Sequence, residues 1–165
     1  MRAAHPVYRG DDEVTDDASK GTPFTMATVK ALLNHAWPIP GFVYERIDFE
    51  PGGRGRLNVR LRAHEQIRLR CSYCQRSCPG YDRLPARRWR QVPLWNIVCW
   101  YYYAPRRVRC PEHGVVVEHL FWSQGKRPWT IRMMVFLSMW ARRVSWRETA
   151  RAFGVSWEAV FGSVE

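Results

Sequence analysis

Hydrophobic residues recur along this chain at two different spacings. Between Thr25 and Trp37 the apolar side chains lie three or four residues apart, which predicts a short amphipathic helix that Pro38 ends. Further on, apolar and polar residues alternate, as they do in half-buried strands. We therefore expect short, antiparallel strands over residues 42–49, 57–61, 67–71, 89–92, 97–103, 106–109 and 115–120. A hairpin turn is expected through residues 63–66.

The last third of the chain has a helical pattern. Thr130 can cap a helix over residues 131–144 that is apolar on most sides and must therefore pack against other elements. Ser145 and Glu148 have the spacing of a capping box, and Gly154 is a suitable end for that helix. Ser156 can then cap a final helix.

Composition indicates a folded protein with an uneven charge. The chain is 46% hydrophobic and 14% aromatic, whereas residues 1–22 are polar and acidic and are expected to form a disordered tail. Residues 1–53 contain 5 Lys/Arg and 8 Asp/Glu, a net charge of −3, and residues 54–165 contain 21 and 7, a net charge of +14. Such an arginine-rich segment suits phosphate recognition, although a solvated basic surface has the same composition.

Nothing in the sequence predicts a membrane or export segment. The N-terminus lacks the apolar stretch of a signal peptide, and the longest apolar run, residues 133–141, is too short to span a bilayer. We expect no membrane partner and a cytoplasmic location.

The cysteines predict a metal site. They number five, an odd count, and cluster between residues 71 and 110, which argues against a disulfide framework. Cys71 and Cys74 are separated by two residues, and so are Cys110 and His113. Two such pairs supply the four thiolate and imidazole ligands of a closed, structural Zn²⁺ site. The alternative is that these cysteines are free or redox-active.

The two remaining cysteines are assigned other roles. Cys78 follows Cys74 closely and could replace a neighbouring ligand, but the simpler interpretation makes it a spare thiol. Cys99 alternates with Ile97 and Tyr101 and is expected in the core.

The C-terminal helices have the spacing of a helix-turn-helix. Ala150 allows close helix approach, Gly154 permits the turn, and Val160 packs the second helix on the first. The second helix would enter the major groove of double-stranded DNA. A generic helical hairpin is the alternative. The candidate DNA contacts of this unit are Arg147, Arg151, Ser156, Trp157 and Glu158.

Basic residues flanking the expected zinc site are further candidates for phosphate contacts. They occur in the runs 83–90 and 106–109, and they could position the protein on DNA without reading sequence. These candidates are Arg87, Arg88, Arg106 and Arg107.

Together these patterns predict an α+β protein, in which a small antiparallel zinc-ribbon-like β domain precedes a helical helix-turn-helix domain. The expected organisation is an acidic tail (1–22), a short helix and lead-in (23–53), the zinc-binding β domain (54–124) and the helix-turn-helix domain (125–165), the last ending within its recognition helix.

The combined motifs resemble the ISL-three family of insertion-sequence transposases over about residues 40–165. The resemblance rests on Cys71-x2-Cys74, Tyr81-Asp82, Arg88-Trp89-Arg90, Pro93-Leu94-Trp95, residues 105–114, Trp122 and the helix-turn-helix. It implies an N-terminal zinc domain and helix-turn-helix that recognise the terminal inverted repeats of the element during DNA transposition. It also implies zinc ligands at Cys71, Cys74, Cys110 and His113, the last replacing the commoner cysteine.

In that family a downstream nuclease domain supplies Asp-Asp-Glu carboxylates. After residue 120 this sequence contains only Glu148, Glu158 and Glu165, too few for two-metal phosphoryl transfer. We therefore expect no strand cleavage by this chain, which resembles a truncated transposase that binds DNA, with a possible homo-oligomer or association with a full-length transposase. Two alternatives stay open, a zinc-ribbon transcription regulator or protein-interaction module, and a redox enzyme using Cys71 and Cys74.

Overall fold

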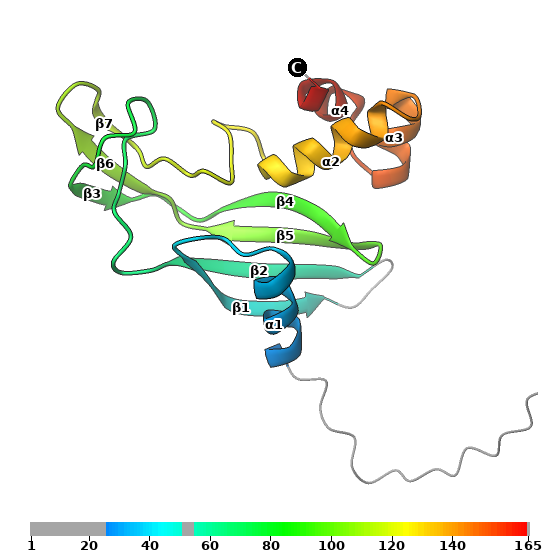
Figure 1. The fold of residues 1–165 in the computed structure, drawn as a ribbon, viewed down its shortest axis with the longest axis horizontal. Coiled ribbons are helices and arrows are strands. Elements are labelled where there is room, and N and C mark those ends of the chain that lie inside the picture. Colours follow the sequence, from blue (N-terminus) through cyan, green and yellow to red (C-terminus); the bar gives the residue numbers. More distant parts are fainter. Residues whose placement is uncertain (1–25, 51–54, 165) are drawn as a thin grey trace, which may run out of the picture.

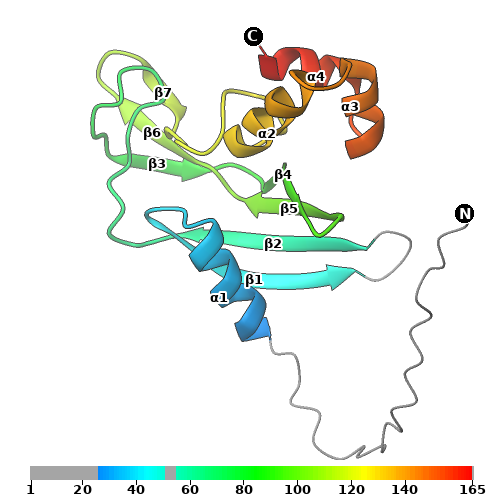
Figure 2. The ribbon, with the colours of Figure 1, turned by 45° about the vertical axis from the view of Figure 1, so that its right-hand side comes forward.

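The computed structural model describes residues 26–50 and 55–164, and it has an α+β architecture of two sheets and four helices. The larger sheet has four strands and the smaller has three. Figure 1 shows the larger sheet in the middle, the smaller one at one end, and α2, α3 and α4 above the other end. Figure 2 shows the same arrangement from a second angle, with α1 lying against β1 and β2. The predicted tail, residues 1–22, lies outside the described residues.

The four-stranded sheet has the order β1-β2-β5-β4 and includes one parallel pair. Its strands are β1 (Phe42–Glu50), β2 (Arg56–Ala63), β4 (Arg87–Leu94) and β5 (Ile97–Tyr103). β1 pairs with β2 and β4 with β5 in antiparallel fashion, whereas β2 and β5 run parallel. The expectation of antiparallel strands throughout was therefore wrong, because the excursion between β2 and β4 brings the chain back with β5 beside β2. β1, from the predicted lead-in, belongs to this same sheet.

One face of this sheet carries the main core. Val59, Trp89 and Tyr101 are almost completely buried there, and α1 (Met26–Ala36) contributes Leu33, which is also buried. Trp122 closes the core, packing edge-to-face on Trp89 with ring centroids 5.0 Å apart. Alternation along the strands thus sends one set of side chains into this core and the other set to the opposite face.

The predicted hairpin through residues 63–66 was wrong in its second strand. A turn is present, closed by the Ile67 amide donating to the His64 carbonyl at 3.1 Å, but residues 67–71 do not pair with β2. Both edges of β2 are already occupied, by β1 and β5. The Leu69 carbonyl instead accepts a hydrogen bond from the Cys78 amide at 3.0 Å. This bond closes the loop over residues 70–77, which contains Cys71 and Cys74.

The three-stranded sheet is small and antiparallel, in the order β3-β6-β7. It consists of β3 (Gly80–Arg83), β6 (Arg106–Cys110) and β7 (Gly114–Val117). Its buried cluster contains Cys71, Cys78, Val108 and Cys110, so most of its buried side chains are thiols. So small a core needs a further crosslink to hold its loops.

Three helices form the C-terminal unit: α2 (Ile131–Ala141), α3 (Trp146–Phe153) and α4 (Trp157–Val164). α2 ends at the Arg142 cap rather than at residue 144, and Thr130 caps its start as predicted. The Ser145–Glu148 capping box and the left-handed Gly154 cap of α3 are also confirmed. Their shared core contains Met133, Leu137, Ala150 and Val160. None of the helices in the described ranges has the length and apolar character needed to cross a membrane.

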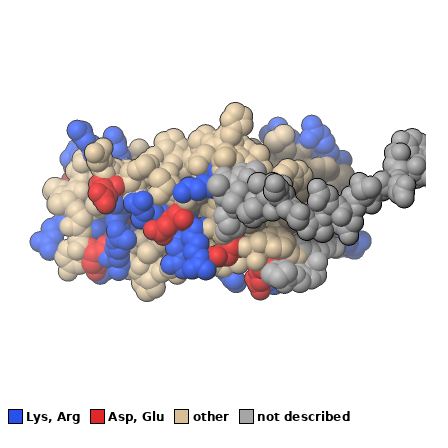
Figure 3. Space-filling model, turned by 90° about the horizontal axis from the view of Figure 1, so that it is seen from below, with Lys and Arg blue, Asp and Glu red and all other residues tan. Residues whose placement is uncertain are grey.

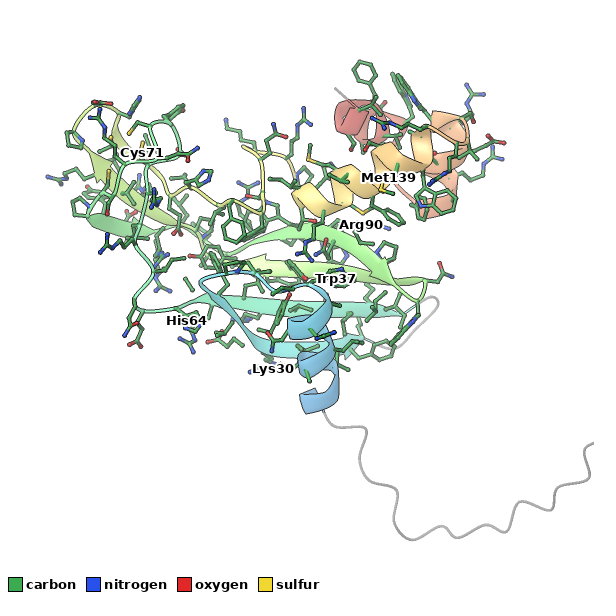
Figure 4. All side chains as sticks on the ribbon, in the orientation of Figure 1. Lys30, Trp37, His64, Cys71, Arg90 and Met139 are labelled. Atoms are coloured by element: carbon green, nitrogen blue, oxygen red, sulfur yellow. The ribbon has the colours of Figure 1, made fainter. Side chains whose placement is uncertain are left out.

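Polar contacts hold these helices on the four-stranded sheet. Arg90 of β4, labelled in Figure 4, donates to the Phe153 carbonyl at 2.6 Å and to the Gly154 carbonyl at 3.1 Å. These are unpaired carbonyls at the end of α3, where a cation is favourable. The arginine therefore anchors the turn between α3 and α4 to the sheet.

Candidate metal centre and nucleic-acid interface

The four predicted zinc ligands converge at the far end of the molecule from the helices. Cys71 and Cys74 lie on the loop after β2, Cys110 ends β6, and His113 lies in the tight turn before β7. One ligand atom from each of the four lies within 4.8 Å of the others. Cys71 marks this region in Figure 4. Two loops whose nearest ligands, Cys74 and Cys110, are 36 residues apart in the sequence thus meet at one point, as the sequence predicted.

Three of the six distances between the ligand atoms match those of a tetrahedron around zinc, and the other three do not exceed 4.8 Å. Zn–S bonds of about 2.3 Å and Zn–N bonds of about 2.0 Å require S···S edges near 3.8 Å and S···N edges near 3.6 Å. Cys74 Sγ lies 3.6 Å from Cys110 Sγ, and His113 Nδ1 lies 3.5 Å from Cys110 Sγ and 3.7 Å from Cys71 Sγ. The donor set and its geometry therefore fit a four-coordinate metal ion.

Neighbouring residues support this arrangement. The Tyr73 ring stacks on His113, with centroids 5.1 Å apart and planes 17° from parallel. The backbone amide of Tyr73 donates to Cys71 Sγ at 3.4 Å. Arg76 pairs with Glu112 across the two loops. These contacts hold the side chains of the four candidate ligands in position, as hydrogen-bonding and stacking neighbours of metal ligands do. The sequence analysis missed them, although Tyr73 and Glu112 lie inside the two ligand motifs, where such a role could be sought.

Ionisation also favours metal binding at Cys110. A hydrogen bond with His113 lowers the pKa of the Cys110 thiol to about 6, in spite of burial, so this sulfur is a thiolate near neutral pH. For Cys74, a backbone hydrogen bond with Arg76 lowers the pKa, but burial and hydrogen bonds with Cys110 and Cys71 raise it overall. A metal ion must therefore displace the Cys74 proton on binding.

Of the other two cysteines, Cys99 lies in the core as predicted, and Cys78 lies beside the cluster. Cys78 is buried beside the cluster but is not one of the four convergent ligands, and its thiol donates to the Arg76 carbonyl at 3.4 Å. Cys99 is completely buried in the main core, and burial raises its pKa to about 12. All five cysteines are free of disulfides.

The candidate DNA contacts of the helical unit are exposed. Arg147 and Arg151 lie on α3, and Ser156, Trp157 and Glu158 lie at the start of α4. The Ser156 hydroxyl accepts the Ala159 amide at 3.3 Å and is thus partly used as a helix cap. The exposed surface of α4 is partly apolar: Trp157 is 54%, Val164 46% and Phe161 38% exposed.

Arg87 and Arg88 project from β4 toward aromatic rings. The Arg87 guanidinium lies 4.8 Å from the Trp89 ring centroid and donates to the Lys126 carbonyl at 3.1 Å. Arg88 is exposed, and its guanidinium lies 4.6 Å from the centroid of Trp100. Of the two, Arg88 is the more accessible to a phosphate.

Arg106 and Arg107 are engaged by carboxylates, which gives them structural roles. Arg106 forms a bidentate pair with Glu118, from Nη2 to Oε2 at 2.6 Å and from Nε to Oε1 at 3.1 Å, and the two side chains are only 14% and 4% exposed. Arg107 pairs with Asp82 of the neighbouring strand β3, and that pairing lowers the pKa of Asp82. A phosphate contact would have to break these pairs, so the proposal that Arg106 and Arg107 clamp DNA is not favoured.

On at least one side of the molecule the basic residues do not form a continuous positive surface. Figure 3 shows one side on which basic and acidic side chains lie interspersed. Three ion pairs join residues of β1 and β2, namely Arg46–Asp48, Arg56–Glu50 and Arg62–Glu45. Part of the positive charge on β1 and β2 is therefore balanced by neighbouring carboxylates. Comparisons with protein-family models, curated proteins and solved structures give no match.

Proposed function

We propose that this chain is a zinc-stabilised, DNA-binding protein of the kind found in the N-terminal part of insertion-sequence transposases. The observation that carries the proposal is the Cys71–Cys74–Cys110–His113 cluster, in which three of the distances between ligand atoms match a zinc tetrahedron. With all four positions supplied by the protein, the ion would be structural and not catalytic. It would crosslink the three-stranded sheet, whose own core is small.

The helix-turn-helix assignment of α3 and α4 is supported by their packing. Ala150 is buried at the contact with Val160, and the Val155 amide donates to the Ala150 carbonyl at 3.0 Å, which shapes the turn. Gly154 has φ of +57°, a conformation that glycine adopts without strain. In the proposed complex α4 lies in the major groove, while Arg147 and Arg151 contact the flanking backbone phosphates.

DNA selection tests this function. Zinc-loaded protein would be incubated with a pool of random duplexes, and the retained duplexes sequenced. The proposal expects an enriched motif, and affinity for it that falls steeply with salt. Arg151→Ala should weaken binding to any duplex and lower the salt slope by about 1. Arg68→Ala, an exposed arginine in the segment after β2 and outside α3 and α4, is the matched control. An absence of enrichment, or equal losses in both variants, would contradict the proposal.

If the resemblance to transposases holds, the DNA that this chain binds is the inverted repeat found at each end of an insertion element. No strand cleavage is expected, because the described part of α2–α4 offers only Glu148 and Glu158, and Glu148 is engaged in a helix cap. Incubation of the protein with Mg²⁺ or Mn²⁺ and inverted-repeat DNA should leave the DNA intact. Cut product would contradict this part of the proposal.

A protein-interaction module is the second candidate, and the composition of α4 favours it. Trp146, Trp157 and Phe161 form an exposed aromatic group, with Phe161 5.4 Å from Trp146 and 6.2 Å from Trp157 between ring centroids. Apolar rings of this kind are typical of protein interfaces and do not hydrogen-bond to base edges. Under this alternative, Trp157→Ala would abolish partner binding or self-association, and Arg151→Ala would leave both unchanged.

A redox enzyme is less well supported. Such an enzyme needs a nucleophilic thiolate in the Cys71–Cys74 pair. The thiol with a lowered pKa is instead Cys110, which lies on the other loop, and the pKa of Cys74 is raised. Metal analysis of purified protein separates the two possibilities.

A further inference from the structure

The four-stranded sheet has a second face that the core does not cover. Along β2, β4 and β5, residues alternate between almost complete burial and partial or full exposure. Pairing places the outward residues side by side: Arg60 of β2, Tyr102 of β5 and Arg88 of β4 share one row, and Asn58, Trp100 and Arg90 share the next. We call this surface the outer sheet face and define it by Arg56, Asn58, Arg60, Arg88, Trp100 and Tyr102.

Unpaired positive charge surrounds the centre of this face. Arg60 and Arg88 are exposed, and neither is within ion-pair distance of a carboxylate in the part of the chain that the structure describes. Arg56 has only a long contact of 4.0 Å with Glu50. These guanidinium groups differ in this respect from Arg106 and Arg107, and they remain available for an anionic partner.

Two aromatic rings occupy the middle of the face. Trp100 and Tyr102 are two residues apart on the central strand β5, so their Cα atoms are separated by about 6.6 Å along it. The Tyr102 hydroxyl donates to Asn58 Oδ1 at 3.3 Å, which orients that ring across the neighbouring strand β2. Arg88 and Arg90 approach the Trp100 ring, with guanidinium carbons 4.6 and 5.9 Å from its centroid. Arg88 and Trp100 thus form a cation–π pair that holds the planar guanidinium group beside the indole ring.

We propose that the outer sheet face binds single-stranded DNA, with bases stacking on Trp100, Tyr102 and the Arg88 guanidinium and with Arg56 and Arg60 contacting phosphates. Rings on a sheet face can reach the faces of bases only where these are unpaired, because in a duplex each base face is covered by its neighbours. A four-stranded sheet face is also too wide to enter a groove, unlike a helix. Aromatic rings at the centre with cationic groups around them are the combination that single-strand binding requires.

DNA suffices as the partner because none of these contacts needs a 2′-hydroxyl. The two neutral polar side chains on the face, Asn58 and Tyr102, hydrogen-bond to each other. The remaining groups recognise phosphates and base faces, which are common to all sequences. We therefore expect binding with little sequence preference and strong salt dependence.

This surface adjoins the helical unit but does not depend on it. A hollow lies between the sheet and the end of α3, lined by Arg90 and Val98 on one side and by Ala152 and Gly154 on the other. The outer sheet face therefore borders the turn between α3 and α4. Single-strand binding by the sheet goes beyond the proposed duplex recognition, and either could be present without the other.

Fluorescence anisotropy of the full, zinc-loaded chain with a labelled oligothymidylate tests the proposal. Arg60→Glu and Arg88→Glu should each weaken binding several-fold at low salt, whereas Arg68→Glu, an equal change of charge off the face, should have little effect. Trp100→Leu should weaken binding roughly five- to a hundredfold, the cost of losing one stacked base. Circular dichroism and metal content would verify that each variant is folded. Because Arg60 and Arg88 are exposed, those two variants test the face even if Trp100→Leu fails to fold.

Three outcomes would overturn the proposal. The first is an equal effect of Arg60→Glu and Arg68→Glu. The second is a duplex of the same length that competes as well as the single strand. The third is an oligouridylate RNA that binds far more tightly than oligothymidylate. Duplex binding measured in parallel on Arg151→Ala separates the two proposals, since loss of duplex recognition there should leave oligothymidylate affinity unchanged.

Discussion

The hydroxyl of Thr130 donates a hydrogen bond to Oε1 of the buried Gln91 at 2.7 Å while it accepts the Met133 amide at 3.1 Å. One oxygen thus caps α2 and fastens it to β4. Gln91 continues the chain of hydrogen bonds, because its Nε2 donates to Tyr101 at 3.1 Å, and the Tyr101 hydroxyl lies 3.3 Å from that of Tyr44. This buried network joins the helical unit to three strands of the sheet.

Thr130→Val should lower the free energy of unfolding by about 1–2 kcal/mol, because it removes a helix cap and one of the two hydrogen bonds that Gln91 Oε1 accepts, leaving only the one from the Val92 amide. Urea denaturation would measure the loss. Thr149→Val is the matched control, since the Thr149 hydroxyl is buried and has no hydrogen-bond partner among the described residues. The control should be neutral or stabilising, and equal losses in the two variants would contradict this account of Thr130.

Metal removal should unfold the three-stranded sheet. We expect one zinc ion per chain, and Co²⁺ in its place should give the thiolate charge-transfer and tetrahedral ligand-field absorption bands of a Cys3His site. Chelation should abolish the dispersed amide signals of β3, β6 and β7, because their core has few other buried side chains. Cys110→Ser should lose the Co²⁺ spectrum.

Cys78→Ala is the control for this experiment. It removes a thiol of the same cluster that is not one of the four convergent ligands, so the Co²⁺ bands should persist. Bands that vanish in Cys78→Ala and survive in Cys110→Ser would reassign the ligands.

Glu118→Ala should destabilise the protein strongly. Glu118 is buried and accepts hydrogen bonds from the Tyr103 hydroxyl and the Arg106 amide, both at 2.7 Å, in addition to the Arg106 guanidinium. Removing it leaves a nearly buried cation without a partner, at a cost of about 3–5 kcal/mol. The double variant Arg106→Met/Glu118→Leu should recover part of that loss, because it removes both charges together. Denaturant unfolding of the two single variants and of the double variant gives a double-mutant cycle, which measures the interaction energy of the pair. A double variant as unstable as the summed single changes would show that the two residues do not interact.

Stability at acid pH should depend on the capping box of α3. The Ser145 hydroxyl and backbone amide hydrogen-bond to the Glu148 carboxylate and lower its pKa below the ordinary 4.5. A group whose pKa is lowered in the folded state stabilises the protein above its ordinary pKa, and the contribution is lost as pH falls through the folded value. The stability difference between wild type and Glu148→Gln should therefore be constant near neutrality and shrink below about pH 4.5. A difference that grows as the pH falls would contradict the assignment.

The short-range features of this protein were readable in its sequence. Both ligand pairs, the capping box, the Gly154 turn and the Thr130 cap each depend on residues within a few positions of one another, where spacing alone decides which atoms can meet. The burial of Cys99 was predictable for a similar reason, since strand alternation assigns each residue a face.

Long-range pairing was decided by the tertiary structure. The alternation in residues 67–71 resembled a strand, but both edges of β2 were taken. One of them is taken by β5, which becomes adjacent only after the chain has folded through residues 64–86 and β4. The sequence suggested Arg106 as a phosphate contact, but in the folded chain its guanidinium pairs with Glu118, twelve residues away. Likewise, the row of Arg60, Tyr102 and Arg88 exists only because three separate strands align in register. Local spacing fixes a side chain's direction within its own element, whereas which elements become neighbours depends on burial of the whole core.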